Sequence, residues 1–434
     1  MGARRPPRPP GRGAGGGGGG PARPAAAPPR AAVAPTVLAL GTVSLVTDVS
    51  SEMVTAVLPL YLVTGLGLSP LGFGLLDGIH NGFSALVRLA GGHLADRGGG
   101  RHKWVAGAGY GISALCKPLL LMAHSLAPIG LVLAADRTGK GLRTAPRDAL
   151  ISLSSTPEAR GRAFGVHRAM DTAGALFGPP AAFLILRATV DGYDAVFTVS
   201  FCVAVSGVLV LVLFVPGGRV RGPADAARPT VRAALALLRR RDLRRVTVCA
   251  LLLGLATVSD SFVYLLLQRR LGVPDRWFAL LPLGTAAAFL LLAVPLGRLA
   301  DRVGRWRVFL AGHGSLLLAY TLLLTSWHGT ALPCAVLALH GGFYAATDGV
   351  LMAAASEGVP EELRSSGLAV VQTGQSTARF ACSLLFGAAW TLWGDRTALA
   401  VATAALAGCA ALSVALRPAS LRPAALRPSQ EHAS

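Results

Sequence analysis

The chain is a succession of apolar stretches, each roughly 20 residues long, separated by short turns that contain glycine and proline. A helix of about 20 residues is long enough to cross the hydrocarbon core of a bilayer, which is roughly 30 Å thick. We therefore predict twelve membrane-spanning helices. Their predicted bounds are residues 36–64, 72–95, 104–124, 127–150, 162–187, 195–216, 246–268, 277–300, 306–326, 330–352, 364–390 and 397–416.

The composition agrees with a membrane protein and excludes a water-soluble fold. Of the 434 residues 53% are hydrophobic and only 14% are charged, against about 25% charged in soluble chains. A net charge of +20 would suggest nucleic-acid binding in a soluble protein. However, 15 of these charges lie outside the apolar runs, in residues 1–30, 217–245 and 417–434. We therefore expect no nucleic-acid partner.

The basic residues of the short connections predict the orientation, because cytoplasmic loops are enriched in Lys and Arg. With the N-terminus inside, the inner connections carry Arg97, Arg101, Lys103, Arg160, Arg302, Arg305, Arg307 and Arg364. The outer connections at 65–71, 125–126, 188–194 and 327–329 carry none, whereas another outer connection holds Arg269, Arg270 and Arg276. We expect a multi-pass protein of the cell inner (plasma) membrane with both termini in the cytoplasm.

An internal repeat divides the chain into two halves. The sequence GHLADR at residues 92–97 recurs as GRLADR at 297–302, an offset of 205, and a second pair of motifs, at 157–161 and 360–365, has an offset of 203 to 204. Two unrelated motifs at one offset predict two homologous halves of six helices each. The predicted organisation is a disordered basic arm (1–35), an N-terminal half (36–216), a basic cytoplasmic linker (217–245), a C-terminal half (246–416) and a cytoplasmic tail (417–434).

The repeated G-x-L-A-D-R-x-G loop signature resembles that of the major facilitator superfamily of secondary transporters, and the resemblance covers residues 36–416. It implies an all-α integral membrane fold with twelve transmembrane helices in two pseudo-symmetric six-helix halves around a central cavity. In that family the signature is a conformational latch between the halves. The corresponding residues are Gly92, Asp96, Arg97, Arg101, Gly297, Asp301, Arg302 and Arg305. The first copy departs from the pattern, since Gly100 stands where a basic residue is usual.

Two more elements are similar to motifs of this family. Arg137-Thr138-Gly139-Lys140-Gly141 looks like its R-x-x-x-G-x-G element, whose arginine is tied to proton coupling. Gly174, Gly178 and Pro179 are similar to its G-x-x-x-G-P element, which is associated with antiporters. Physically, the glycines allow two helices to approach closely and the proline bends a helix, so helix packing alone is the alternative interpretation. Residues 47–53 and 164–172 resemble a branch of prokaryotic permeases often labelled efflux-type.

Ionisable side chains inside spans cost on the order of 3 kcal/mol each, which makes them functional candidates. Asp48 and Glu52 share one helix face, and a carboxylate beside a moving arginine can bind and release a proton. A buried structural ion pair is the alternative. The candidates for proton coupling are Asp48, Glu52, Arg137, Arg168 and Asp171. The candidates for lining the substrate cavity are Asp77, His80, Lys140, His167, Asp260, Tyr344, Asp348, Gln372, Gln375 and Arg379.

The sequence offers no signal for a metal or a cofactor. The six cysteines lie inside or at the edge of predicted spans without a C-x-x-C pair, and the nine histidines lack ligand spacing. There is also no G-x-x-x-x-G-K-[ST] nucleotide-binding loop, so uphill transport would draw on an ion gradient.

The expected function is secondary active transport, with proton-coupled export of a small organic molecule or drug by alternating access of a monomer. The partners are then the small-molecule substrate, protons and the lipid bilayer. The alternative is proton-coupled uptake of an organic anion or metabolite, which Arg137, Lys140, Arg168 and Arg379 would favour if they face the cavity. A receptor-like member of the fold is a further alternative. We expect no enzyme, because the short loops offer no nucleophile with a base.

Overall fold

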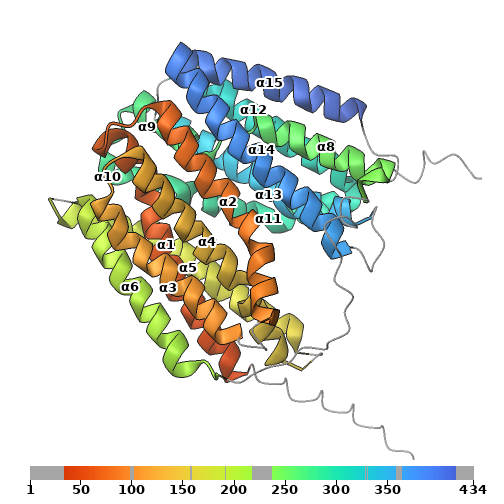
Figure 1. Cartoon of the computed structure of the whole chain (residues 1–434). Coiled ribbons are helices and arrows are strands. Elements are labelled where there is room, and N and C mark those ends of the chain that lie inside the picture. The colour runs from red at the N-terminus through yellow and green to blue at the C-terminus, as the bar shows by residue number, and fades with distance from the viewer. Residues whose placement is uncertain are drawn as a thin grey trace, which may run out of the picture. The chain divides into compact units, whose positions relative to one another are not determined.

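The computed structural model describes residues 34–97, 102–156, 159–190, 192–217, 237–327, 329, 331–357 and 364–416. The predicted N-terminal arm and C-terminal tail, and most of the predicted linker, lie outside these residues. Throughout the described part of the chain the regular elements are helices, and none is a strand (Figure 1).

The twelve predicted spans are confirmed as helical segments. In the N-terminal half they are α1 (Pro35–Leu60), continued by the π-helical turn η1 (Tyr61–Gly65), then α2 (Pro70–Arg97), α3 (His102–Met122), α4 (Leu126–Leu153), α5 (Arg160–Ala188) and α6 (Gly192–Phe214). The C-terminal half contains α8 (Arg241–Ala256), α9 (Asp260–Leu271), α10 (Asp275–Phe278), α11 (Leu281–Val303), α12 (Arg305–Leu324), α13 (Ala331–Glu357), α14 (Arg364–Trp393) and α15 (Asp395–Ala415).

Hydropathy did not predict that the seventh span is broken at residues 257–259, between α8 and α9. A break inside a membrane is tolerated only where the freed backbone groups find partners. Here the Val258 N–H donates to the Tyr320 hydroxyl at 2.8 Å, and the Cys382 thiol donates to the Thr257 carbonyl at 3.1 Å. The broken segment therefore presents irregular backbone to the interior at a fixed position.

Nine of the twelve spans are apolar enough over their described residues to be recognised as membrane-crossing from length and hydropathy. The other three are α2, α4 and α14. These helices carry many of the charged and polar side chains that the site uses. Their polarity is tolerable because each packs against other helices of the protein: α2 against α4 and α14, and α4 also against α3.

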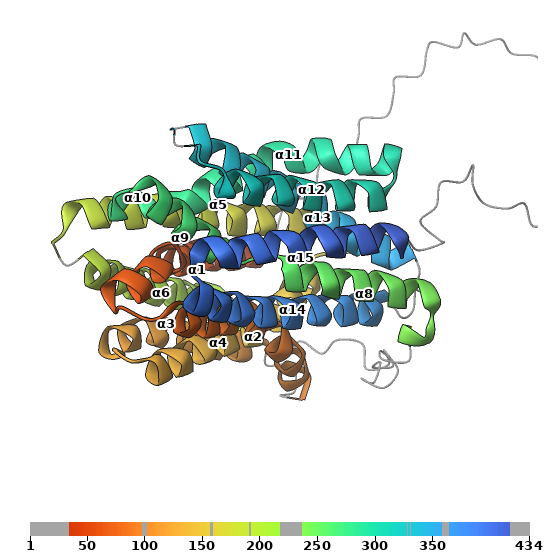
Figure 2. The same ribbon diagram turned by 90° about the horizontal axis from the view of Figure 1, so that it is seen from above.

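Each half packs mainly within itself. Helix α1 contacts α5 and α6 in the N-terminal half, while α13 contacts α11 and α12 in the C-terminal half. Figures 1 and 2 show the red-to-yellow helices and the green-to-blue helices as these two groups. The most extensive contact between the groups is the packing of α2 against α14.

In the α2–α14 contact the backbones of the two helices pack directly against each other. A Cβ atom added to Gly74 would lie 2.4 Å from the Ser383 carbonyl oxygen, and one added to Gly387 would lie 2.4 Å from that of Pro70. Nearby, the Leu71 N–H donates to the Thr391 hydroxyl at 3.0 Å. The halves are thus held together where α2 begins and α14 ends, which we call the closed end.

Candidate functional site

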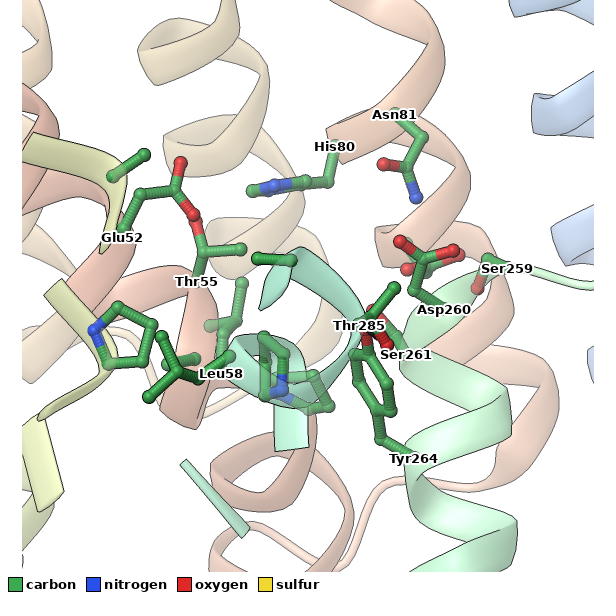
Figure 3. A pocket seen from close by; sticks show the side chains of 18 of the residues that line it. Glu52, Thr55, Leu58, His80, Asn81, Ser259, Asp260, Ser261, Tyr264 and Thr285 are labelled. Carbon is green, nitrogen blue, oxygen red and sulfur yellow. Dashed lines mark hydrogen bonds between the residues drawn. The ribbon is translucent and has the colours of Figure 1, made fainter. Parts of the chain in front are cut away.

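A cavity of about 440 Å³ lies between the two halves (Figure 3). The N-terminal half lines it with α1, α2 and α5. The C-terminal half lines it with α9, α10, α11, α13 and α14, and with the broken segment at 257–259. Pro179 of the predicted Gly-Pro element also faces this cavity.

Seven residues proposed from the sequence line the cavity: Glu52, Asp77, His80, Asp260, Tyr344, Asp348 and Arg379. Four residues that we expected there do not line it: Lys140, His167, Gln372 and Gln375. The expectation was wrong for these four because charge and depth in a span do not specify which way a helix face points. His167, for example, is buried against α1, where its Nε2 lies 3.0 Å from the Ser44 hydroxyl.

The uncharged polar residues that line the cavity were not predicted from the sequence. Hydroxyl and amide groups come from Thr55, Asn81, Ser259, Ser261, Tyr264 and Thr285, among other residues (Figure 3). One signal was available: the run Ser259-Asp260-Ser261 places three polar residues in the middle of an otherwise apolar span. Such a run marks the point where the helix is interrupted.

Two cavity carboxylates are held by neutral donors. The Ser383 hydroxyl of α14 donates to Asp77 Oδ2 of α2 at 2.6 Å, so this hydrogen bond joins the two halves. The Tyr344 hydroxyl donates to Asp260 Oδ1 at 2.5 Å. The Nε2 atom of His340 lies 3.3 Å from the same oxygen without hydrogen-bond geometry.

Glu52 and His80 face each other across another part of the cavity (Figure 3). Glu52 is half-buried and has no hydrogen bond or ion pair with any residue that the structure describes. The His80 Nδ1 atom is buried and likewise lacks a hydrogen-bond partner there. These two groups are therefore available to a bound molecule.

A second cluster of charges lies outside the cavity lining, between α1, α4 and α5. Arg143 Nη2 is 3.3 Å from Asp48 Oδ1, with both side chains largely buried. Arg147 Nη1 is 3.6 Å from Asp171 Oδ1. Arg147 also reaches the Ser44 hydroxyl at 3.4 Å, which links the cluster to His167.

The arginine partners within this cluster differ from those expected. Arg137 pairs with its neighbour Asp136, Nη2 to Oδ2 at 2.6 Å, and not with Asp48 or Asp171. Arg143 lies six residues after Arg137, so on an α-helix it points about 120° away and reaches a different neighbour. Arg168 does contact Asp171, at 3.5 Å, but its side chain is 80% exposed.

Arg143 and Arg147 were therefore missed as partners of the two aspartates. They lie four residues apart on one face of α4, a spacing that was visible in the sequence. The Arg143 guanidinium also stacks 4.4 Å from the centre of the Tyr110 ring, which fixes its position from the side of α3.

The predicted Gly-Pro element forms a close helix contact. A Cβ atom on Gly174 would lie 2.4 Å from the Leu45 carbonyl oxygen, and one on Gly178 would lie 2.5 Å from the Glu52 Cβ atom. The two glycines therefore set the distance between α5 and α1, and this distance brings Asp171 close to Asp48.

The second latch copy lies at the junction of α11 and α12. Arg305 Nη2 is 3.3 Å from Asp301 Oδ1, and Gly304 has φ of 102°, a backbone conformation that favours glycine. For the first copy, the backbone of α2 is described as far as Arg97, but the side chains of Asp96 and Arg97 are not, and Arg101 lies outside the described residues.

The chain is similar to known proteins in sequence and in fold. The family model described as "Major Facilitator Superfamily" matches residues 40–381 and, in a second match, 277–433. An uncharacterized MFS-type transporter of Methanocaldococcus jannaschii, MJ1317, is 28% identical over 368 residues, which are 83% of this chain and 89% of that protein.

Two solved structures share the fold. A variant of the nucleoside transporter NupG matches with a TM-score of 0.76 at 15% identity, over 88% of this chain and 100% of that one. A variant of the peptide transporter POT matches with a TM-score of 0.71 at 14% identity, over 90% and 95%.

Proposed function

The chain belongs to the major facilitator superfamily and is a multi-pass membrane transporter, and we propose that it exports a small organic molecule in exchange for protons. The central cavity, lined by both halves, is the proposed substrate site. In this proposal the cavity is exposed alternately to the two sides of the membrane as the halves rock, and one polypeptide chain is the functional unit.

The observation that carries proton coupling is the buried cluster around Asp48 and Asp171. Each carboxylate lies next to an arginine of α4, at 3.3 Å for Arg143 and 3.6 Å for Arg147. A carboxylate paired with an arginine stays ionised, whereas the same group takes up a proton when the arginine moves away and the site stays dry. Movement of α4 relative to α1 and α5 would therefore couple protonation to the conformation.

The proposed direction of transport, export, is supported by the similarity of Gly174, Gly178 and Pro179 to the antiporter element. Their close contact with α1 places this element beside the proposed coupling cluster. The two structural neighbours are a nucleoside transporter and a peptide transporter, so this fold accommodates polar organic solutes.

Uptake of an organic anion receives less support from the geometry. Such uptake would require several cations in the cavity. Of the four proposed residues Arg137, Lys140, Arg168 and Arg379, only Arg379 lines the cavity. Arg379 in turn interacts electrostatically with Asp260 and Asp348. One cation among four cavity carboxyl groups is a poor receptor for an anion.

The test is solute accumulation in proteoliposomes under an imposed pH gradient. We expect the gradient to drive accumulation against the solute gradient, and we expect a protonophore to abolish it. Accumulation that persists with the protonophore, or that requires sodium, would contradict proton coupling.

The proposed topology, with both termini in the cytoplasm of a cell bounded by an inner membrane, rests on the arginine asymmetry of the connections. A reporter fused after Ser434 should be active only inside the cell. Activity on the outside would overturn the orientation while leaving the fold intact.

A further inference from the structure

We infer that the central cavity takes an organic cation, a molecule with an ammonium, guanidinium or phosphonium group on an apolar body, and that Glu52 receives its positive charge. This inference deepens the proposed function, because it assumes that the cavity is the transport site. It does not depend on the coupling ion or on the direction of transport.

The first argument is the balance of charge. Four carboxyl groups line the cavity, from Glu52, Asp77, Asp260 and Asp348, against a single guanidinium, that of Arg379. With all four ionised the lining has three more negative than positive charges, and with one of them protonated it has two more. Behind His80 lie the Asp136–Arg137 pair, which is neutral as a whole, and Lys140, which offsets one more charge.

The second argument is that the four carboxyls are not equivalent. Asp77 accepts from Ser383 and Asp260 accepts from Tyr344, while Asp348 is exposed and has the positive charge of Arg379 nearby. Glu52 has no such partner among the described residues. A carboxylate that is half-buried without a partner loses hydration and gains nothing in return, so it attracts a cation strongly.

The third argument is the rest of the lining, which suits the body of such a molecule. Apolar walls of the same cavity are formed by Leu58, Pro59, Leu62 and Leu176. Aromatic rings also line the cavity, and their faces attract cations within about 6 Å. These rings belong to Phe73, Tyr264, Phe278, Phe289 and Tyr344.

Arginines at other places on the chain do not reverse this balance. Arg143 and Arg147, the buried arginines of α4, are outside the lining and are paired with Asp48 and Asp171. The field inside the cavity is therefore set mainly by its own carboxyls, since interactions are strongest at short range in a medium of low dielectric constant.

The experiment compares two probes of the same shape and opposite charge, tetraphenylphosphonium and tetraphenylborate. Binding to the purified full chain in nanodiscs of zwitterionic lipid is measured by equilibrium dialysis, after subtraction of binding to empty nanodiscs. No ion gradient is present. We expect the wild type to bind tetraphenylphosphonium saturably and at least about tenfold more tightly than tetraphenylborate.

Variants then locate the charge. Glu52→Gln should weaken tetraphenylphosphonium binding by about tenfold, whereas Glu52→Asp, which keeps the charge, should retain most of the affinity. Asp275→Asn removes one negative charge from an exposed position outside the cavity, so its affinity should equal that of the wild type. The thermal unfolding midpoint of each variant shows whether it is folded.

Three results would overturn the inference: no saturable binding of tetraphenylphosphonium, binding of tetraphenylborate that is equal or tighter, or an unchanged affinity in folded Glu52→Gln. The comparison of the two probes in the wild type decides the charge preference even if no variant folds. Cation selectivity without pH-driven transport would leave this inference intact and remove only the proposed coupling.

Discussion

The carboxylates of the charge cluster in the N-terminal half and those of the central cavity have different partners. In the N-terminal half Asp48 and Asp171 lie next to the arginines of α4. In the C-terminal half the closest partner of Asp260 is a neutral hydroxyl, that of Tyr344. A charged partner determines whether a carboxylate holds a proton, while a neutral donor mainly fixes its orientation.

The helix packing of the two halves also differs: the contact between α1 and α5 is tighter than the corresponding contact between α8 and α14. Between α1 and α5, glycines bring backbone against backbone at Gly174 and Gly178. Between α8 and α14, which hold the corresponding places in the repeat, Gly374 faces side-chain atoms of Leu251 at 3.4 Å or more. The N-terminal pair is thus closely spaced around its charges, whereas the C-terminal pair is less tight, with Gly254 facing the Ala378 Cβ atom at 3.1 Å and Gly374 facing the tip of Leu251. We interpret this as a division between coupling in the first half and solute contact shared with the second.

The substitution with the largest expected effect tests the charge cluster of the N-terminal half. Asp48→Asn should abolish pH-driven accumulation in proteoliposomes, because the amide cannot bind and release a proton as Arg143 moves. Downhill exchange of the solute should remain largely intact. Full pH-driven transport in this variant would remove Asp48 from the mechanism, and its retention in Glu52→Gln and Asp171→Asn as well would refute proton coupling.

A matched pair of alanine substitutions tests the packing difference. Gly178→Ala should destabilise the protein by roughly 2 kcal/mol, because the new methyl group meets the Glu52 backbone and Cβ atom. Gly374→Ala should cost less than about 1 kcal/mol, because the tip of Leu251 can move. Thermal unfolding midpoints in detergent measure both. Equal losses would show that the two helix pairs are equally rigid.

Removal of the Tyr344 hydroxyl tests the neutral donor of the C-terminal half. Tyr344→Phe should lower stability by about 1.5 kcal/mol, since a hydrogen bond to a carboxylate is lost. Tyr264→Phe is the control, because its hydroxyl donates to the neutral Thr285 and its loss should cost about 0.5–1 kcal/mol. The reverse order of the two losses would argue against an ionised Asp260.

The smallest effect is expected at the latch, away from both clusters. Asp301→Asn should slow solute exchange several-fold while it changes the solute affinity less than about twofold, because Asp301 lies outside the cavity and pairs with Arg305. Stopped-flow exchange and equilibrium binding give the two values. A parallel loss of affinity would indicate misfolding or a ligand role.

The fold could be predicted from the sequence because its main determinants are long-range patterns. Span length and the repeat at an offset of about 205 give twelve helices in two halves. The interruption at residues 257–259 was not predictable in the same way. It is stabilised by Tyr320 and Cys382, which are 62 and 125 residues away in the chain.

The site could be predicted only in part, because the sequence gives the depth of a side chain more readily than its direction. Asp77 and Asp260 line the cavity, whereas Lys140 and His167 do not. From the sequence Arg137 was the candidate of this helix for proton coupling, but the rotation of about 120° between Arg137 and Arg143 makes Arg143 the one that meets Asp48. Residue facing depends on how the helices pack, which only the structure shows.

The backbone contact between Gly74 and Ser383 also affects whether protons can leak between α2 and α14. Protons move readily along files of hydrogen-bonded water, and such a file needs a continuous gap between neighbouring helices. At this contact the two main chains lie too close to admit even a methyl group. A file of water molecules therefore has no room to pass between α2 and α14 at this contact.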